Sequence, residues 1–167
     1  HAEITVEVNP GDNLAEFFPL CADSGVNRVS IGLQSANDNE LKNLTRRHTS
    51  LDVADAVKLA RLSGIDNISL DLMLATEGQT EETIARSIDF CAELHANHIS
   101  AYMLKIEGNT PFYDKKGDMN IPDEDRAAEM YLFACNRLEN RGYKQYEISN
   151  FAKPGCHSRH NLKYWNM

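Results

Sequence analysis

Three stretches of this sequence share one pattern, in which an apolar strand candidate follows the end of a helix candidate. They read Gly25-VNRVSIGLQ, Gly64-IDNISLDLM and Ala96-NHISAYML, with serines 30, 69 and 100 in corresponding positions. Strand and helix alternating at such intervals is typical of βα units, whose parallel strands are buried on both faces. The sequence therefore predicts an α/β fold, in which ligand sites lie at the carboxyl ends of the strands.

The remaining elements follow from hydrophobic periodicity and from capping residues. We expect a single domain, with βα units over about 1–142 and the start of a further extension over about 143–167. The expected strands cover 3–8, 28–34, 67–74, 98–104 and 143–151. The expected helices are one after the turn at 9–12, a short one over 37–44, one over 51–63 capped by Ser50, one capped by Thr80, and one from Asp123 to Gly142.

The charge balance argues against several classes of partner. The 167 residues include 17 Lys and Arg against 25 Asp and Glu, for a net charge of −8, which disfavours nucleic acid and anionic membranes as partners. No apolar run approaches the roughly 20 residues needed to cross a bilayer. We therefore expect no transmembrane segment and a cytoplasmic location.

Because the chain starts without Met and stops just after an aromatic pair, we expect it to be part of a longer protein.

The four cysteines are widely scattered, at positions 21, 91, 135 and 156. No CxxC or CxxxCxxC pattern is present, so neighbouring thiols of this chain do not form an iron–sulfur or zinc site. The cysteines at 21, 91 and 135 fall in helical patterns and are expected to be reduced core residues. We expect no metal site in this chain.

Polar side chains stand where the predicted parallel strands end, and we expect them to meet on one rim. They are Glu7, Asn9, Gln34, Asp71, Lys105 and Glu107. A carboxylate accepts from an ammonium group or from ribose hydroxyls, and Arg46, twelve residues after Gln34, suits a carboxylate or a phosphate. Together these groups would bind an amino acid joined to a nucleoside. The alternatives are that they cap helices and remain solvated, or that Arg46 faces a phosphorylated metabolite.

The segment Cys156–Trp165 is rich in functional side chains, with a thiol, two imidazoles, a guanidinium and two aromatics. A Cys-His-x-x-His run can supply part of a zinc site, but the spacing fits no common zinc module. An axial imidazole with aromatic neighbours suits a haem pocket. The third interpretation is a surface loop whose aromatics pack on the core. Serine-nucleophile, P-loop and dinucleotide fingerprints are absent.

In order and spacing the sequence resembles the radical S-adenosylmethionine (SAM) family of oxygen-independent coproporphyrinogen III oxidases and their haem-chaperone (HemW-type) relatives. The motifs are EVNPG, NRVSIGLQS, LTRRH, NISLDLM, GQT, IEGNTPFY, GYKQYEISNFAKPG and RHNLKYW. The resemblance implies a partial (β/α) barrel, of the TIM-barrel-like kind, to which this chain supplies the third to sixth strands. It also implies that Glu7, Gln34 and Arg46 hold the methionyl part of SAM and that Asp71 holds the ribose.

Within that family, HNLKYW resembles a motif of the haem-chaperone branch, in which the histidine is associated with haem; here it is His160. The resemblance thus implies a protein of tetrapyrrole metabolism that binds haem and passes it to an acceptor protein. The alternative is a true oxidase that decarboxylates the propionates of a porphyrinogen. One departure is Ala75-Thr76-Glu77, where the family usually has Gly-Leu-Pro, so adenosine contacts there are expected to differ.

A second departure is the absence of the family's CxxxCxxC loop, which binds a [4Fe-4S] cluster and is expected upstream on a preceding strand. Without a cluster no electron reaches bound SAM, so we expect no catalytic residue in this chain and no activity from the fragment alone. The isolated fragment would also expose the edge of its first strand. We therefore expect marginal solubility or self-association.

Overall fold

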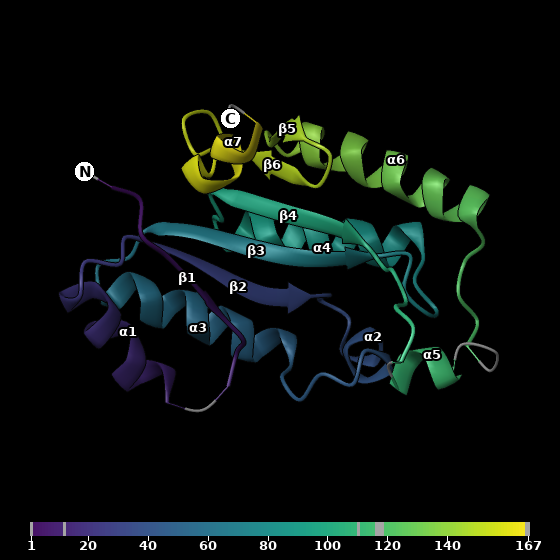
Figure 1. The fold of residues 1–167 in the computed structure, drawn as a ribbon, viewed down its shortest axis with the longest axis horizontal. Coiled ribbons are helices and arrows are strands. Elements are labelled where there is room, and N and C mark those ends of the chain that lie inside the picture. The colour runs from purple at the N-terminus through teal and green to yellow at the C-terminus, as the bar shows by residue number, and fades with distance from the viewer. Residues whose placement is uncertain (1, 12, 110, 116–118, 166–167) are drawn as a thin grey trace.

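The computed structural model describes residues 2–11, 13–109, 111–115 and 119–165. Its centre is one mixed sheet with the strand order β1-β2-β3-β4-β6-β5 (Figure 1). The strands are β1 Thr5–Val8, β2 Arg28–Gln34, β3 Asn67–Leu74, β4 His98–Met103, β5 Lys144–Glu147 and β6 Asn150–Ala152. The first four are parallel neighbours, whereas β6 pairs antiparallel with both β4 and β5. The α/β prediction is confirmed.

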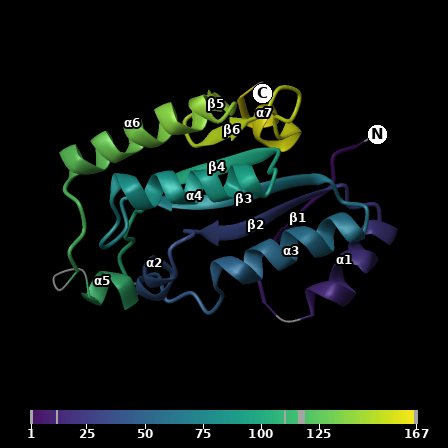
Figure 2. The same ribbon diagram turned by 180° about the vertical axis from the view of Figure 1, so that it is seen from behind.

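Helices cover one face of this sheet and both of its ends. In the view from behind, α3 and α4 lie across the strands, with α1 and α6 beside them (Figure 2). The helices α2 and α5 lie beyond the carboxyl ends of the parallel strands, and α7 lies at their amino ends (Figure 1). The bounds are α1 Leu14–Asp23, α2 Asp38–Asn43, α3 Ser50–Leu62, α4 Glu81–Glu93, α5 Pro111–Lys115, α6 Glu124–Asn140 and α7 Arg159–Trp165. Within the described ranges, no helix is long and apolar enough to span a membrane.

The two faces of the parallel sheet differ in chemistry. Side chains alternate between faces along a strand, and β2 places Val29, Ile31 and Leu33 among the buried apolar core under the helices. The alternate positions of β2 are Arg28, Ser30 and Gly32. All seven residues of β2 are buried, as expected for a parallel strand, but the two faces differ: one is apolar, and the other carries polar groups.

The serine register also differs from the expectation. Ser30 pairs with Ser69, as expected, but Ser69 pairs with His98, and Ser100 pairs with Asp71. The third repeat is thus displaced by two residues along its neighbour. Since side chains alternate with a period of two, this shift keeps Ser100 on the polar face and brings it beside the carboxylate.

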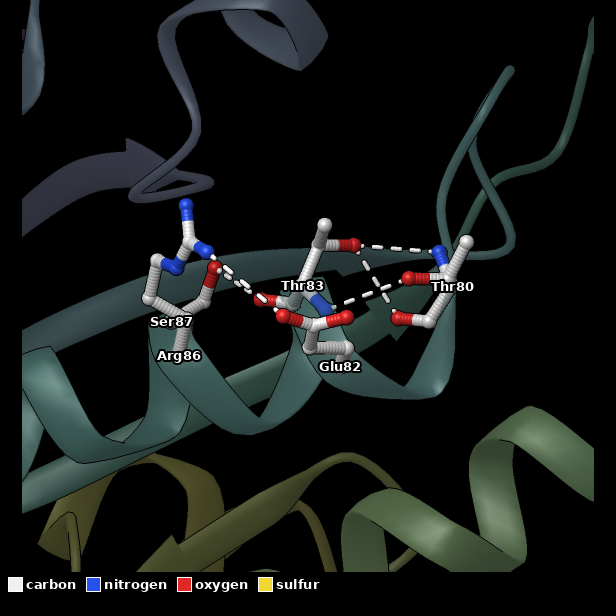
Figure 3. A network of polar contacts seen from close by, with 5 residues as sticks. All are labelled: Thr80, Glu82, Thr83, Arg86 and Ser87. Carbon is white, nitrogen blue, oxygen red and sulfur yellow. Dashed lines mark hydrogen bonds and ion pairs between the residues drawn. The ribbon is translucent and has the colours of Figure 1, made fainter.

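Helix starts were predictable from capping chemistry, with one correction. Thr80 caps α4: the Thr83 backbone N–H donates to the Thr80 hydroxyl at 3.3 Å, and the Thr80 backbone N–H donates to the Thr83 hydroxyl at 3.0 Å (Figure 3). Asp123 caps α6 as expected. For α3 the cap is Thr49 and not Ser50, because Thr49 and Asp52 form a reciprocal capping box and Ser50 is already helical.

The C-terminal part departs most from the predicted elements. The single strand expected over 143–151 is instead the hairpin β5–β6, which turns at Ile148 and Ser149. Of the expected core cysteines, Cys21 and Cys91 are buried, whereas Cys135 is only partly buried. Strand β1 pairs only with β2 among the strands that the structure describes, so it forms an edge of the sheet, as expected.

Candidate functional site

The polar face of the sheet forms a cavity of about 440 Å³, here called the sheet cavity. Its lining comes from the four parallel strands, from Glu3 just before β1, and from the residues at and just before the start of α7. The lining residues are Glu3, Thr5, Glu7, Arg28, Ser30, Asp71, Ser100, Tyr102, Ser158, His160 and Asn161. Two of the predicted SAM ligands, Glu7 and Asp71, thus share one cavity with the predicted haem ligand His160. A volume of this size is ordinary for a small-molecule site.

Asp71 lies in the middle of β3, and not at its end as expected. Its two carboxylate oxygens accept from the Ser30 hydroxyl at 3.0 and 3.2 Å. Burial raises the pKa of Asp71, and the nearby Glu7 carboxylate raises it further, while hydrogen bonds from Ser30 and Ser100 oppose the rise. A carboxylate held in this way keeps free lone pairs toward the cavity, which suits acceptance from vicinal hydroxyls.

Gln34 and Arg46 lie at the carboxyl end of the sheet, where they approach Asn9. The register between β2 and β3 shifts between Gly32 and Gln34, and Gln34 has a left-handed backbone with φ 66°. A bulge of this kind redirects a side chain next to a site. A Cβ on Gly32 would lie 3.0 Å from both Asn9 Oδ1 and Gln34 Nε2, so glycine leaves them room. Arg46 Nη1 lies 3.5 Å from Asn9 Oδ1.

The last two rim candidates border a neighbouring hollow. Lys105 and Glu107 form an exposed ion pair of 2.7 Å. With Arg46, Met73 and Phe112 they line a hollow of about 250 Å³ beside α5. The expected rim is therefore divided: Asn9, Gln34 and Arg46 meet, Lys105 and Glu107 lie beside them, and Glu7 and Asp71 lie deeper on the strands.

The loop after β3, where Ala75-Thr76-Glu77 departs from the family pattern, is held in place by a buried polar network. The amide nitrogen of Gln79 donates to the Met73 carbonyl at 3.0 Å and to Glu40 Oε2 at 3.3 Å. Glu40 also accepts from the Ser35 hydroxyl at 2.7 Å. Ala75 has a left-handed backbone, with φ 57°. The loops after β2 and β3 are thus tied together beside the predicted adenosine site.

His160 is brought to the sheet cavity by contacts at the first turn of α7. Glu3 Oε1 accepts the backbone N–H of Arg159 at 2.9 Å and that of His160 at 3.3 Å. The Ser158 hydroxyl accepts the backbone N–H of Asn161 at 3.3 Å, and the Ser158 N–H donates to the Tyr146 hydroxyl at 3.3 Å. The segment before β1 and the hairpin therefore fix this turn from two sides.

Several polar residues of this face were missed by the sequence reasoning. His98 is fully buried and lies between the Ser69 hydroxyl at 2.8 Å and the Tyr146 hydroxyl at 2.7 Å. Arg28 is buried at the amino end of β2. The sequence feature that could have predicted them is the alternation of apolar residues with other residues in β2 and β3, which indicates that one face of the sheet is polar.

Metal-ligand chemistry finds no support in the part of the chain that the structure describes. No group of three or more His, Cys, Asp or Glu side chains there is arranged to hold a metal ion. Burial raises the pKa of the Cys91 thiol, which keeps it protonated and inert. The zinc interpretation of Cys156, His157 and His160 is thus unsupported, and these residues do not fit an iron–sulfur cluster.

Comparison with known sequences gives consistent matches. The Radical SAM superfamily matches residues 1–91. The heme chaperone HemW of Bacillus subtilis is 42% identical over 167 residues, and that of Lactococcus lactis is 40% identical over 166 residues. These alignments cover 99% and 98% of this chain but 44% of each relative, so the chain spans less than half the length of the curated relatives it matches.

Comparison with solved structures supports the same architecture. The Escherichia coli coproporphyrinogen III oxidase HemN, described as a radical SAM enzyme, superposes with a TM-score of 0.82 at 20% identity, over 99% of this chain and 38% of that one. The Elp3 protein of Methanocaldococcus infernus superposes with a TM-score of 0.68 at 21% identity, over 80% of this chain and 32% of that one. At such identities the likeness shows the fold, which is a partial radical-SAM barrel.

Proposed function

Because this chain belongs to the radical SAM superfamily, we propose that it forms the SAM-binding and haem-binding part of a tetrapyrrole-metabolism protein of the haem-chaperone kind. One observation carries the proposal: His160 lines the same cavity as Glu7 and Asp71. The relatives named heme chaperone HemW, at about 40% identity, support this branch. The structural likeness to the oxidase, at 20% identity, supports the fold alone.

For SAM, the proposed ligands divide by their chemistry. Arg46 and Gln34, which approach Asn9 at the rim, suit the methionyl carboxylate, and the carboxylate of Glu7 suits the ammonium group. Asp71, with both oxygens on the Ser30 hydroxyl, is oriented to accept from the ribose. When a reduced cluster is present, SAM supplies radical chemistry. The cluster ligands are proposed to lie outside this chain, since its described residues do not fit them.

For haem, the proposed axial ligand is His160. Its helix begins at the amino end of the sheet, held by the Glu3 carboxylate, and the imidazole borders the cavity. A neutral imidazole is a common iron ligand in haem proteins.

We further propose that bound haem passes to an acceptor protein in the cytoplasm. This is tested by mixing the haem-loaded protein with an apo-haemoprotein and following the Soret band.

The deciding experiment is a haem titration of the protein that contains this chain, followed by Soret absorbance. His160→Ala is expected to abolish or shift the Soret band of bound haem. The matched control is His157→Ala, because His157 is exposed, lies three residues away and packs on Tyr146 instead of lining the sheet cavity. Haem binding that is equal in wild type and His160→Ala, or absent from wild type, would overturn the proposal and redirect work to anaerobic coproporphyrinogen oxidation.

A further inference from the structure

Arg28 is a buried cation that faces the sheet cavity. It is the first residue of β2, its residue exposure is 5%, and it lines the cavity beside Glu7 and Ser30. Its Nε atom is buried without a hydrogen-bond partner, and none of the ion pairs among the described residues includes Arg28. A buried charge without a partner is costly, so this geometry points to a missing anionic group.

The atoms beside Arg28 strengthen this inference. Thr5 and Asn67 are its register partners on the two neighbouring strands. Thr5 Oγ1 and Asn67 Oδ1 are also buried without a hydrogen-bond partner in the described chain. Three adjacent strands thus carry unsatisfied polar atoms in one row, although buried polar groups are nearly always hydrogen-bonded. Thr5 and Arg28 are both among the residues that line the sheet cavity.

Two of the three carboxylates that line the cavity, those of Glu3 and Asp71, are engaged elsewhere, and no ion pair joins the third, Glu7, to Arg28 among the described residues. Glu3 Oε1 accepts two backbone N–H groups of α7, and Asp71 accepts from Ser30. Burial raises the pKa of Asp71 and the charge of Arg28 opposes that rise, but the two side chains do not form an ion pair. A guanidinium with free N–H groups, next to a hydroxyl, matches the two oxygens of a carboxylate.

We propose that Arg28 and Thr5 form a carboxylate subsite at the amino end of the sheet cavity, and that its occupant is a propionate of the tetrapyrrole whose iron faces His160. This rests on the proposed haem function. The competing source, the methionyl carboxylate of SAM, is assigned to Gln34 and Arg46 at the other end. Arg28 and Gln34 are the first and last residues of a seven-residue strand, so about 20 Å separates the two positions. His160 is at the Arg28 end.

The test compares haem with its dimethyl ester, in which the propionates are uncharged. Both are titrated into the protein that contains this chain, as wild type, Arg28→Met and Arg28→Lys. We expect Arg28→Met to weaken haem binding by roughly ten- to a hundredfold, the range of a charge-assisted hydrogen-bonded contact, and Arg28→Lys to weaken it less. The dimethyl ester should bind wild type less tightly than haem and should not distinguish wild type from Arg28→Met. The Soret position should not change, because His160 remains the ligand.

Other results separate the possible failures. Equal binding of haem and its dimethyl ester to wild type would overturn the subsite while leaving haem binding intact, and it requires no variant to fold. An equal loss of both ligands in Arg28→Met would assign Arg28 a structural role, such as pairing with a residue outside this chain. If Arg28→Met loses SAM binding but binds haem as wild type does, the subsite belongs to SAM. Absence of haem binding by wild type would overturn both this subsite and the proposed function.

Discussion

The imidazole Nε2 of His98 lies 2.7 Å from the hydroxyl oxygen of Tyr146, across the width of strand β6. The residue of β6 that pairs with His98 is Ala152, whose methyl side chain is small. The other ring nitrogen lies 2.8 Å from the Ser69 hydroxyl. A neutral imidazole donates at one nitrogen and accepts at the other, and hydroxyls serve either role. The last parallel strand is thus joined to the hairpin that supports α7.

The first prediction concerns acid stability. Burial, aided by the positive charges of Arg28 and His157, lowers the pKa of His98 to about 3 from 6.5. The unfolded chain therefore binds a proton at this residue between pH 6.5 and 3, and the folded chain does not, so acidification through this window favours unfolding. At pH 5 we expect His98 alone to cost about 2 kcal/mol of the free energy of unfolding. Urea denaturation at pH 7 and pH 5, for wild type and His98→Asn, measures this difference.

Asp71 supplies the opposing contribution in that experiment. Burial raises its pKa, so the folded state binds its proton more readily and gains relative stability as the pH falls. The comparison with His98→Asn removes this contribution because Asp71 is common to both proteins. If wild type and His98→Asn lose equal stability between pH 7 and pH 5, His98 is not the acid-sensitive group.

The second prediction concerns Ala75, which occupies a left-handed backbone conformation with φ 57°. A Cβ is strained there, by about 1 kcal/mol, and glycine is not. Ala75→Gly is expected to raise the free energy of unfolding by up to about 1 kcal/mol, less any loss from its buried methyl group. The matched control is Ala128→Gly in the exposed interior of α6, where the same substitution should cost about 1 kcal/mol. If Ala75→Gly and Ala128→Gly both lower the free energy of unfolding, or both raise it, the strain argument is contradicted.

Much of the fold was predictable because local chemistry decides it. The alternation of Val29, Ile31 and Leu33 with polar residues marks a strand, and Thr80 and Asp123 cap helices by hydrogen bonds to residues three positions away. The hairpin over 143–151 was missed because its turn at Ile148 and Ser149 carries none of the glycine, proline or Asn-Gly signals on which turn prediction depends.

The candidate site was less predictable because it depends on strand register. Nothing in the local sequence shows that Ser100 pairs with Asp71, or that Arg28 stands between Thr5 and Asn67. The bulge that turns Gln34 toward Asn9 is likewise a property of the paired strands. Strand ends and the family resemblance predicted four of the site residues, which are Glu7, Gln34, Arg46 and Asp71. Neither predicted that Gln34 and Arg46 lie at the rim while Glu7 and Asp71 lie in the sheet cavity.

The third prediction concerns the contact of Asp89 with α6. Its carboxylate accepts from Arg137 Nε at 3.0 Å and from Arg141 Nε at 2.8 Å, and these contacts lower its pKa. Asp89→Asn leaves two guanidinium groups without their counter-charge and should lower the free energy of unfolding by about 1–2 kcal/mol. Asp55→Asn, at an exposed position on α3, is the control and should change it by less than about 0.5 kcal/mol. If Asp89→Asn and Asp55→Asn change the free energy of unfolding equally, the contacts of Asp89 with Arg137 and Arg141 add no stability.

The fourth prediction tests the methionyl end of the site. Adding SAM should raise the melting temperature of the protein that contains this chain, since a ligand that binds only the folded state stabilises it. Arg46→Ala should reduce that shift, because the guanidinium that approaches Asn9 is lost. The control is Arg47→Ala, which removes the same side chain from the next, exposed position. A shift caused by inorganic phosphate and not by SAM would instead favour a phosphorylated-metabolite site.

The last prediction concerns the attachment of α7 to the strand edge. Glu3 Oε1 accepts the backbone N–H groups of Arg159 and His160, so it satisfies donors that have no partner within the helix. Glu3→Ala removes this acceptor, and Glu3→Gln keeps an oxygen but loses the charge that favours a helix amino terminus. We expect the amide hydrogen exchange of residues 159–165 to become faster from wild type to Glu3→Gln and faster again in Glu3→Ala. Haem affinity is expected to fall in the same order. Glu16→Ala, an exposed change on α1, should leave both unchanged. Faster exchange with unaltered haem affinity would show that haem binding does not depend on the anchored position of His160.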